Sequence, residues 1–402
     1  MKNTQKNILV ISYWSLREPL TAAAVFPYLR LLSARKDIKK IHLVTLETTR
    51  DFLPEVDLNI EKVEHHAINP RLQWWFKLSR IYLHIRAVLL MTHLIKKEKI
   101  DLMFAKASMA GAIAHIVHRL TGTPYIVDSF EPHSIYMLEC GVWRSSDIRF
   151  KFANHFEGSQ LKHAQYVITV THNHRNDLIA EGSDPNRIKV IPSITDLAVF
   201  KPDCSAREQI RRQLGIPFNS TVGIYVGKFG GLYYEEEAYR IFGRAFEHFS
   251  DLHMIILSPA DPTTIRSMAL QAGLPGDRLH VMMVPHVEVP DYLSAADFAF
   301  STIKPSPIKR YQCPIKNGEY WANGLPILMT DGISDDHLLM RKGLGGSVFQ
   351  PDMSDLDSAL VQIKHILARP EHKKEIIELA LQYKSVELAA KVYDEILGPS
   401  GS

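Results

Sequence analysis

The segment Pro314-Ile-Lys-Asn-Gly-Glu-Tyr-Trp-Ala-Asn-Gly-Leu-Pro-Ile327 predicts a helix that is followed at once by a strand. Its first proline suits the opening turn of a helix, where the missing N–H leaves no bond unmade. Gly324 suits the end of that helix, and the apolar run led by Pro326 is typical of a buried strand. The N-terminus of this helix is therefore expected to lie beside a strand end.

Short apolar runs alternate with helical patterns along the whole chain. The runs expected to form strands are residues 7–12, 41–46, 102–105, 125–128 and 166–170, followed by 221–227, 254–257, 279–283, 298–301 and 326–329. Apolar strands that alternate with helices form parallel sheets covered on both faces. We therefore expect an α/β fold with doubly wound parallel sheets.

A change of pattern between residues 188 and 202 separates the two series of strands. This stretch contains two prolines and has no helical period, as expected of a last strand and a linker. We expect one α/β domain at residues 1–200, a second at 201–378, and a closing helix and tail at 379–402. Ligands bind beyond the carboxyl ends of parallel strands, so a cleft between the two domains is the expected site.

The composition excludes several classes of protein. The 402 residues are 46% apolar and 23% charged, which is typical of a globular chain. Lys and Arg number 47 against 44 Asp and Glu, so the charge of +3 gives no reason to expect nucleic acid as a partner. The three cysteines lack metal-ligand spacing, and we expect neither a metal site nor disulfides. No export signal or membrane-spanning stretch is recognised, which favours a cytoplasmic location.

The helix predicted after Pro314 carries groups that suit a nucleotide. Its first amide N–H groups, its dipole and the charge of Lys316 favour a diphosphate. Glu319, one turn further, is placed to accept hydrogen bonds from the hydroxyls of a ribose. The alternative is an ordinary ion pair between Lys316 and Glu319, three residues apart on one helix.

This segment resembles the C-terminal-domain signature of the GT-B glycosyltransferases, in particular the retaining enzymes of family 4. In that family the second glutamate of a Glu-x7-Glu pair holds the donor ribose, and it matches Glu319. Tyr225-Val-Gly-Lys-Phe229 is similar to the turn that opens the family's second domain, which implies that Lys228 contacts the donor diphosphate. The stretches at 289–301 and 164–202 are similar to further parts of the same fold in the same order.

The resemblance implies a GT-B fold with an acceptor-side first domain, a nucleotide-sugar-binding second domain, and a last helix that returns to the first. It implies transfer of a hexosyl-type sugar from a nucleoside-diphosphate donor to an acceptor hydroxyl, with retention, in bacterial-type polysaccharide or glycolipid assembly. No cofactor or metal is expected, because Lys228, Lys316 and the helix amides, including that of Asn317, would neutralise the leaving diphosphate.

Three departures from the family pattern affect the expected donor site. Tyr311 stands where the family has its first glutamate, which contacts the donor sugar. Gly230 and Gly231 stand near the position of a second basic residue, so their backbone amides or Lys316 would replace its charge. The loop after the first strand lacks the usual glycine pair, and Thr21 is the residue there that offers a hydroxyl and an N–H to phosphates.

Val127-Asp-Ser-Phe-Glu-Pro-His133 follows a predicted strand of the first domain. Side chains at such a strand end face the ligand side of the sheet, which makes Glu131 and His133 candidates for contacts with the acceptor or the donor sugar. The family's histidine in this loop aligns with Phe130. The alternative is a solvated His133 and a Glu131 that precedes a proline turn.

Residues 71–99 combine aromatic side chains with seven Lys or Arg, opposed only by Glu98. This mixture favours contact with an anionic membrane surface, which suits an enzyme that acts on a lipid-linked acceptor at the inner face of the cell membrane. The alternative is an amphipathic helix that packs on the core and is otherwise solvated.

Two other functions fit the same fold. A sugar-nucleotide epimerase would use the same nucleotide pocket without an acceptor. A non-catalytic binding or scaffold protein would explain why Tyr311 and Phe130 replace polar groups of the family.

Overall fold

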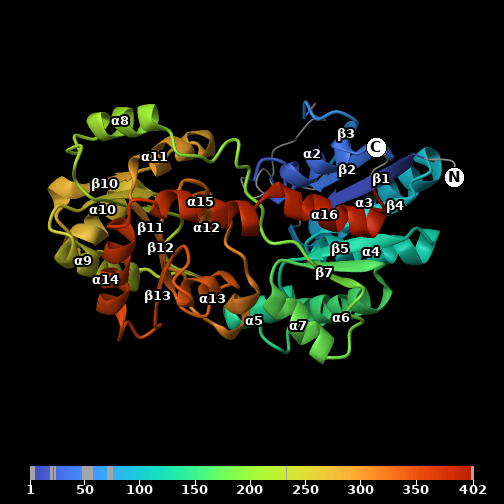
Figure 1. The fold of residues 1–402 in the computed structure, drawn as a ribbon. Coiled ribbons are helices and arrows are strands. Elements are labelled where there is room, and N and C mark those ends of the chain that lie inside the picture. The colour runs from blue at the N-terminus through green and yellow to red at the C-terminus, as the bar shows by residue number, and fades with distance from the viewer. Residues whose placement is uncertain are drawn as a thin grey trace. The chain divides into compact units, whose positions relative to one another are not determined.

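The computed structural model describes residues 5–18, 21, 24–47, 58–69, 76–231 and 233–399, except for the side chains of 76–80. Two compact units make up the chain: unit 1 contains residues 1–192 and 386–402, and unit 2 contains residues 193–385 (Figure 1). Among the described helices, none has the length and apolar character needed to cross a membrane. Each unit is an α/β layer structure around one parallel sheet.

The sheet of unit 1 has the strand order β3-β2-β1-β4-β5-β6-β7 in the described residues, and every neighbouring pair is parallel. Its strands are β1 (Lys6–Ser12), β2 (Ile38–Leu46), β3 (Val63–Ile68), β4 (Leu102–Lys106), β5 (Tyr125–Ser129), β6 (Tyr166–Thr169) and β7 (Ile188–Val190). The central strands are apolar on both faces because helices cover both, which is why they read as continuous apolar runs.

The helices of unit 1 are α2 (Phe26–Ala34), α3 (Phe76–Glu98), α4 (Ser108–Thr121), α5 (His133–Glu139), α6 (Ile148–His163), α7 (His172–Ala180) and α16 (Val386–Leu397). Alternate strand residues such as Leu9 and Val44 share one core with Met91 of α3 and Val117 of α4. Helices α2 and α16 cover the opposite face, where the ring of Tyr393 lies 5.8 Å from that of Phe104 on β4. The sheet is therefore doubly wound.

Unit 2 repeats this architecture with the strand order β10-β9-β8-β11-β12-β13, again all parallel in the described residues. Its strands are β8 (Val222–Val226), β9 (His253–Leu257), β10 (Leu279–Met282), β11 (Phe298–Ser301), β12 (Ile327–Thr330) and β13 (Gly346–Phe349). Its helices are α8 (Cys204–Gln213), α9 (Glu236–His248), α10 (Pro262–Gln271), α11 (Val289–Ala295), α12 (Ile315–Ala322), α13 (Asp336–Arg341), α14 (Leu356–Leu367) and α15 (His372–Tyr383).

Short 3₁₀ helices complete unit 2: η1 (Gly276–Arg278), η2 (His286–Glu288) and η3 (Pro307–Tyr311). The expected strands are present in both units. Strands β3 and β13 are additional, because the sequence Val-Glu-His-His-Ala-Ile of β3 is not an apolar run and Gly-Ser-Val-Phe of β13 begins with Gly and Ser. The carboxyl ends of β8, β11 and β12 meet at one edge of the sheet, where α12 begins.

Candidate functional site

Helix α12 is anchored against the end of β8 by its buried aromatic residues. Tyr320 and Trp321 are fully buried. The Val226 N–H donates to the Tyr320 hydroxyl over 2.9 Å, and Trp321 Nε1 donates to the Gly345 carbonyl over 2.8 Å. These bonds fix the position of the first turn of α12 relative to the turn that follows β8.

Lys316, on that first turn, extends toward the end of β8. Its Nζ lies 3.4 Å from the Val226 carbonyl oxygen and 4.6 Å from the centre of the Tyr225 ring. Burial lowers the pKa of Lys316 to about 7, and the charge of Glu319 offsets this only in part. The two described side chains make no ion pair with each other, which decides against an ordinary pair on one helix. Lys316 is instead a cation in contact with carbonyl and aromatic groups.

The turn after β8 lies next to Lys316. A Cβ atom added to Gly227 would lie 3.3 Å from Lys316 Nζ, so the backbone comes close to the ammonium group. The Tyr225 hydroxyl donates to the Lys228 carbonyl over 2.5 Å and holds the turn. Lys228 itself is exposed, and Gly230 has a φ of +74°. The structure thus brings Lys228, Gly230 and Lys316 into one region of unit 2.

An acidic side chain also lies at this turn. A Cβ atom added to Gly230 would lie 3.2 Å from a carboxylate oxygen of Glu235, and α9 opens with Glu236 and Glu237. Negative side chains at a helix N-terminus oppose an anionic ligand there. Glu235 is exposed, so its side chain has room to turn away. The start of α12 is therefore a better place for an anion than the start of α9.

Glu319 is buried with a partner that the sequence did not indicate. His286 Nε2, on η2, lies 3.2 Å from Glu319 Oε1. This hydrogen bond raises the pKa of His286, whose side chain is half exposed. The contact orients the carboxylate and leaves Oε2 for a ligand. No local motif predicts it, because His286 lies 33 residues upstream on a separate element.

Asn317 points away from Lys316 and is fully buried. Its Nδ2 donates to Asp336 Oδ2 over 2.9 Å, and Lys384 Nζ donates to the other oxygen of Asp336 over 2.7 Å. The Asn317 side chain therefore joins α12 to α13. Its backbone N–H donates to the Pro314 carbonyl over 3.1 Å, so the helix-start amides that remain for a ligand are those of Ile315 and Lys316.

The predicted site residues of the first domain all lie in unit 1. Thr21 is fully buried, and its hydroxyl donates to the Ser15 carbonyl over 2.7 Å, which stabilises the loop after β1. Ser15 in turn donates to the buried carboxylate of Glu47, which also accepts from Thr45 over 2.6 Å. Glu47 is a residue that sequence reasoning missed. The hydroxyl of Thr21 is thus engaged within the loop.

Glu131 and His133 follow β5 at the carboxyl edge of the sheet and are partly buried. The ring of His133 lies edge-on to that of Trp143 at 5.5 Å, and burial lowers the pKa of His133, which favours its neutral form. Phe130 packs on Trp14 with ring centres 5.7 Å apart, so the loops after β5 and β1 touch. Phe130, the residue before Glu131, therefore lies next to the β1 loop.

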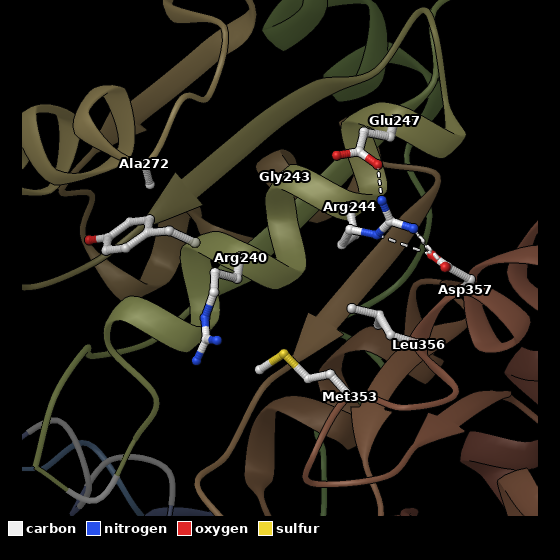
Figure 2. A pocket seen from close by; sticks show the side chains of 9 residues that line it. Arg240, Gly243, Arg244, Glu247, Ala272, Met353, Leu356 and Asp357 are labelled. Carbon is white, nitrogen blue, oxygen red and sulfur yellow. Dashed lines mark hydrogen bonds and ion pairs between the residues drawn. The ribbon is translucent and has the colours of Figure 1, made fainter.

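A pocket of about 390 Å³ lies elsewhere on unit 2, between α9 and the start of α14 (Figure 2). Its lining residues are Tyr239, Arg240, Gly243, Arg244, Glu247, Ala272, Met353, Leu356 and Asp357. Arg244 is paired with Glu247 and Asp357 (Figure 2). Since none of the predicted site residues lines this pocket, it is separate from the region around α12.

Comparisons with known proteins relate the chain to glycosyltransferases. Residues 29–193 match the family described as "Glycosyl transferase 4-like domain". A D-inositol 3-phosphate glycosyltransferase of Xylanimonas cellulosilytica is 30% identical over 142 residues, which is 33% of each chain. The UDP-Gal:alpha-D-GlcNAc-diphosphoundecaprenol alpha-1,3-galactosyltransferase of Escherichia coli is 23% identical over 69% of this chain and 70% of its own. The chain therefore spans about a third of one relative and more than two thirds of the other.

Solved structures with the same fold cover nearly the whole chain. Anabaena HepE in complex with UDP has a TM-score of 0.69 and 15% identity over 98% of this chain and 99% of its own. A "putative UDP-N-acetylglucosamine 2-epimerase" from Listeria monocytogenes has a TM-score of 0.66 and 12% identity over 98% of this chain and 97% of its own. The GT-B fold and the resemblance to glycosyltransferases are confirmed.

Proposed function

We propose that this chain, a glycosyltransferase of the GT-B type, moves a hexosyl group from a nucleoside-diphosphate sugar to an acceptor hydroxyl with retention of configuration. The observation that carries the proposal is the placement of Lys316, between the start of α12 and the turn after β8, one helical turn before the buried Glu319. The UDP bound by Anabaena HepE makes UDP the first nucleotide to test.

Each group around α12 has a role in donor binding. Lys316 and the amides at the helix start would hold the diphosphate, and Lys228 would add a second charge from the exposed turn. A diphosphate near Lys316 would raise the pKa of that lysine from about 7, so the bound lysine would be charged. Glu319, oriented by His286, would accept hydrogen bonds from the ribose hydroxyls.

The reaction needs no side-chain nucleophile. The bond between the anomeric carbon and the diphosphate oxygen breaks, and the acceptor oxygen bonds to the same face of that carbon. The acceptor proton passes to the departing phosphate oxygen, which yields a nucleoside diphosphate and the glycosylated acceptor. Lys316, Lys228 and the helix amides stabilise the charge on the leaving group. Glu131 and His133 are proposed to orient the acceptor or the donor sugar.

The acceptor is proposed to be a glycan or a lipid-linked sugar in polysaccharide or glycolipid assembly. The Escherichia coli relative is named for an acceptor on a diphosphoundecaprenol lipid, which supports this class. Helix α3 also exposes an apolar stripe: Ile81, Ile85 and Leu89 are 59%, 54% and 64% exposed. Its inner face, with Leu83 and Met91, is buried in the core, so the outer stripe exceeds what packing requires. Trp74 and Trp75 lie outside the described residues, as does the side chain of Phe76.

The first experiment measures binding of UDP, GDP, ADP, CMP and dTDP by calorimetry without added metal. Selective binding of one nucleotide is expected. Glu319→Ala should weaken it by ~1.5–3 kcal/mol, since a charged hydrogen bond is lost. Glu378→Ala, at an exposed glutamate of α15, is the matched control and should bind like the wild type. Equal affinity in the Glu319 variant and the control would contradict the ribose assignment.

Two rival functions give different results in the same series. An epimerase would convert the donor sugar without an acceptor, and product analysis after incubation with the donor alone detects this. The epimerase structure with the same fold is the reason to include the test. A scaffold protein would bind none of the nucleotides, and that outcome would replace the catalytic proposal.

Membrane contact is tested by flotation with vesicles that contain about one third phosphatidylglycerol. The wild type should float with them, and Ile85→Ser should reduce the bound fraction severalfold because the variant loses exposed apolar area. Leu381→Ser is the matched control, since Leu381 on α15 is 53% exposed and Ile85 is 54% exposed. An equal loss in both variants would contradict a specific role of α3.

A further inference from the structure

Two histidines stack across the edge of the sheet in unit 1. His42 lies on β2 and His66 on the edge strand β3, with ring centres 5.3 Å apart and planes at 18°. His42 Nδ1 and His66 Nε2 are separated by 3.0 Å. In the register of the two strands, His42 pairs with Glu64 and Val44 pairs with His66. Since alternate residues share a face, His42, Glu64 and His66 all lie on the α3 side of the sheet.

Glu64 completes a set of three ligand atoms. Its Oε1 lies 3.6 Å from His66 Nε2, and its Oε2 pairs with Lys40. One ligand atom from each of His42, Glu64 and His66 lies within 4.8 Å of the other two. Two ligands of a tetrahedral zinc ion are about 3.3 Å apart, given Zn–N bonds of roughly 2.0 Å. The distances of 3.0 and 3.6 Å lie on either side of that value.

The three residues differ in burial in a way that suits a metal site. His42 is fully buried, whereas the side chains of His66 and Glu64 are 12% and 47% exposed. The site is therefore rigid at its back and open at its front, where a hydrated ion can enter. His42 Nε2 is buried without a hydrogen-bond partner. Asn7 Oδ1, a buried acceptor that also lacks one, lies on the adjacent β1 with its side chain on the same face. A metal-bound histidine usually donates its second N–H to such an acceptor.

Unit 2 provides a natural comparison. His253 on β9 and His280 on β10 stack with ring centres 5.5 Å apart at 15°, and His253 Nδ1 lies 3.2 Å from His280 Nε2. The register offset is the same, because Ile255 pairs with His280. The position that matches Glu64 is Arg278, which donates to the Ser250 carbonyl over 2.7 Å. A guanidinium there opposes a cation, so only the pair in unit 1 carries the third ligand.

We propose that His42, Glu64 and His66 bind a divalent transition-metal ion of the zinc class, with water as the fourth ligand. The ion takes the place of the proton shared by the two rings, and that proton moves to the other nitrogen of the ring that carried it, so both rings are neutral ligands. Lys40 remains on Glu64 Oε2 and orients Oε1 toward the metal. The ion joins edge strand β3 to β2. The site contains none of the donor-site residues, so the metal proposal does not depend on the glycosyl-transfer proposal.

The test is calorimetric titration of the chelator-treated full chain with Zn²⁺. We expect about one zinc ion per wild-type chain, consistent with the single described three-residue cluster of this kind. Glu64→Gln and His66→Ala should each weaken that binding at least ~10-fold. His280→Ala, the matched control in unit 2, should bind zinc as the wild type does. Co²⁺ should give the intense visible absorption of a tetrahedral complex in the wild type and in the control only.

Glu64 is half exposed, so Glu64→Gln is expected to fold, and circular dichroism checks this. Zn²⁺ should raise the melting temperature of the wild type and of His280→Ala but not that of Glu64→Gln. Absence of saturable binding in the wild type overturns the proposal. Binding that is unchanged in both unit 1 variants, or lost equally in His280→Ala, overturns it as well.

Discussion

Two lysines at strand ends, one in each unit, have different partners. In unit 1, Lys106 and Asp128 form an ion pair at the ends of β4 and β5, with side chains only 4% and 6% exposed. In unit 2, Lys316 lies at the end of β8 without a carboxylate hydrogen bond among the described residues, against a carbonyl and an aromatic ring. A lysine that is hydrogen-bonded to a carboxylate within the protein supports the fold, whereas one without such a bond is poised to meet a ligand.

The largest expected effect is on the paired charge. Asp128→Ala should lower the free energy of unfolding by ~3–5 kcal/mol, because it leaves Lys106 buried without its counter-charge. The ring of Tyr28, 3.5 Å from Lys106 Nζ, cannot replace a carboxylate. Urea denaturation measures the loss. In the absence of urea, the folded variant should bind nucleotide with the affinity of the wild type. A loss below about 1 kcal/mol would show that this pair stabilises the fold no more than an exposed salt bridge does.

The unpaired lysine should show the opposite behaviour. Lys316→Met should weaken binding of the preferred nucleoside diphosphate by ~1.5–3 kcal/mol, because a charged partner of the diphosphate is lost. Its stability should equal or exceed that of the wild type, since a buried cation is removed. Calorimetry and urea denaturation on the same sample measure both. Lys364→Met, on α14, is a control that should alter neither.

The pH dependence of binding sharpens the contrast. Burial lowers the pKa of Lys316 to about 7 in the free protein, and a bound diphosphate should raise it. Above pH 7 the free protein must therefore take up a proton to bind, so affinity should fall with rising pH by up to ~10-fold per pH unit. Titrations between pH 7.5 and 9.5, where the nucleotide is fully ionised, measure this slope. Lys316→Met should show a flat profile, and a flat wild-type profile would contradict the assignment.

A smaller effect is expected from the backbone that follows β4 and β8. Gly227 follows β8 with a φ of +157°, whereas Ala107 follows β4 with a φ of +73° and a ψ of 158°. That region is almost restricted to glycine, so Ala107→Gly should stabilise the protein by ~1 kcal/mol. Thermal unfolding measures the gain. A destabilised variant would show that the alanine methyl group contributes more packing than the strain costs.

The smallest effect is expected at the partner of Glu319. His286 is half exposed, so the His286–Glu319 contact is partly screened by solvent. His286→Ala should weaken nucleotide binding by less than ~1 kcal/mol, well below the effect of Glu319→Ala. The hydrogen bond to Glu319 raises the pKa of His286, so the charged pair is present at low pH and is lost as pH rises through that pKa. The difference in nucleotide affinity between His286→Ala and the wild type should therefore shrink as pH rises.

The sequence predicted most of the fold because the central strands are apolar runs between helices. It did not predict β3, where Glu64, His65 and His66 interrupt the apolar pattern. Such residues are tolerated there because β3 is an edge strand and its side chains meet polar partners on β2. The sequence did not predict the cluster of His42, Glu64 and His66 either. Its ligands come from two strands rather than from one motif.

The candidate donor site was predictable where helix and turn chemistry are local. Lys316 and Glu319 share one helix, so their spacing placed them on it. His286 and Glu235 were not predictable, since their contacts with Glu319 and Gly230 depend on how separate elements pack. Asn317 illustrates the reverse case: its amide was a candidate, but that N–H donates to the Pro314 carbonyl and the side chain donates to Asp336.

The assignment of α16 to unit 1 has a consequence for biosynthesis. Unit 2 is a continuous insertion between residues 192 and 386, and unit 1 contains both the first and the last parts of the chain. Arg35 of unit 1 binds Asp394 and the Gly398 carbonyl, each over 2.6 Å, and Tyr393 packs on Tyr28. A ribosome therefore synthesises the whole of unit 2 before it synthesises α16. The first part of unit 1 must therefore wait for its covering helix until all of unit 2 has been synthesised.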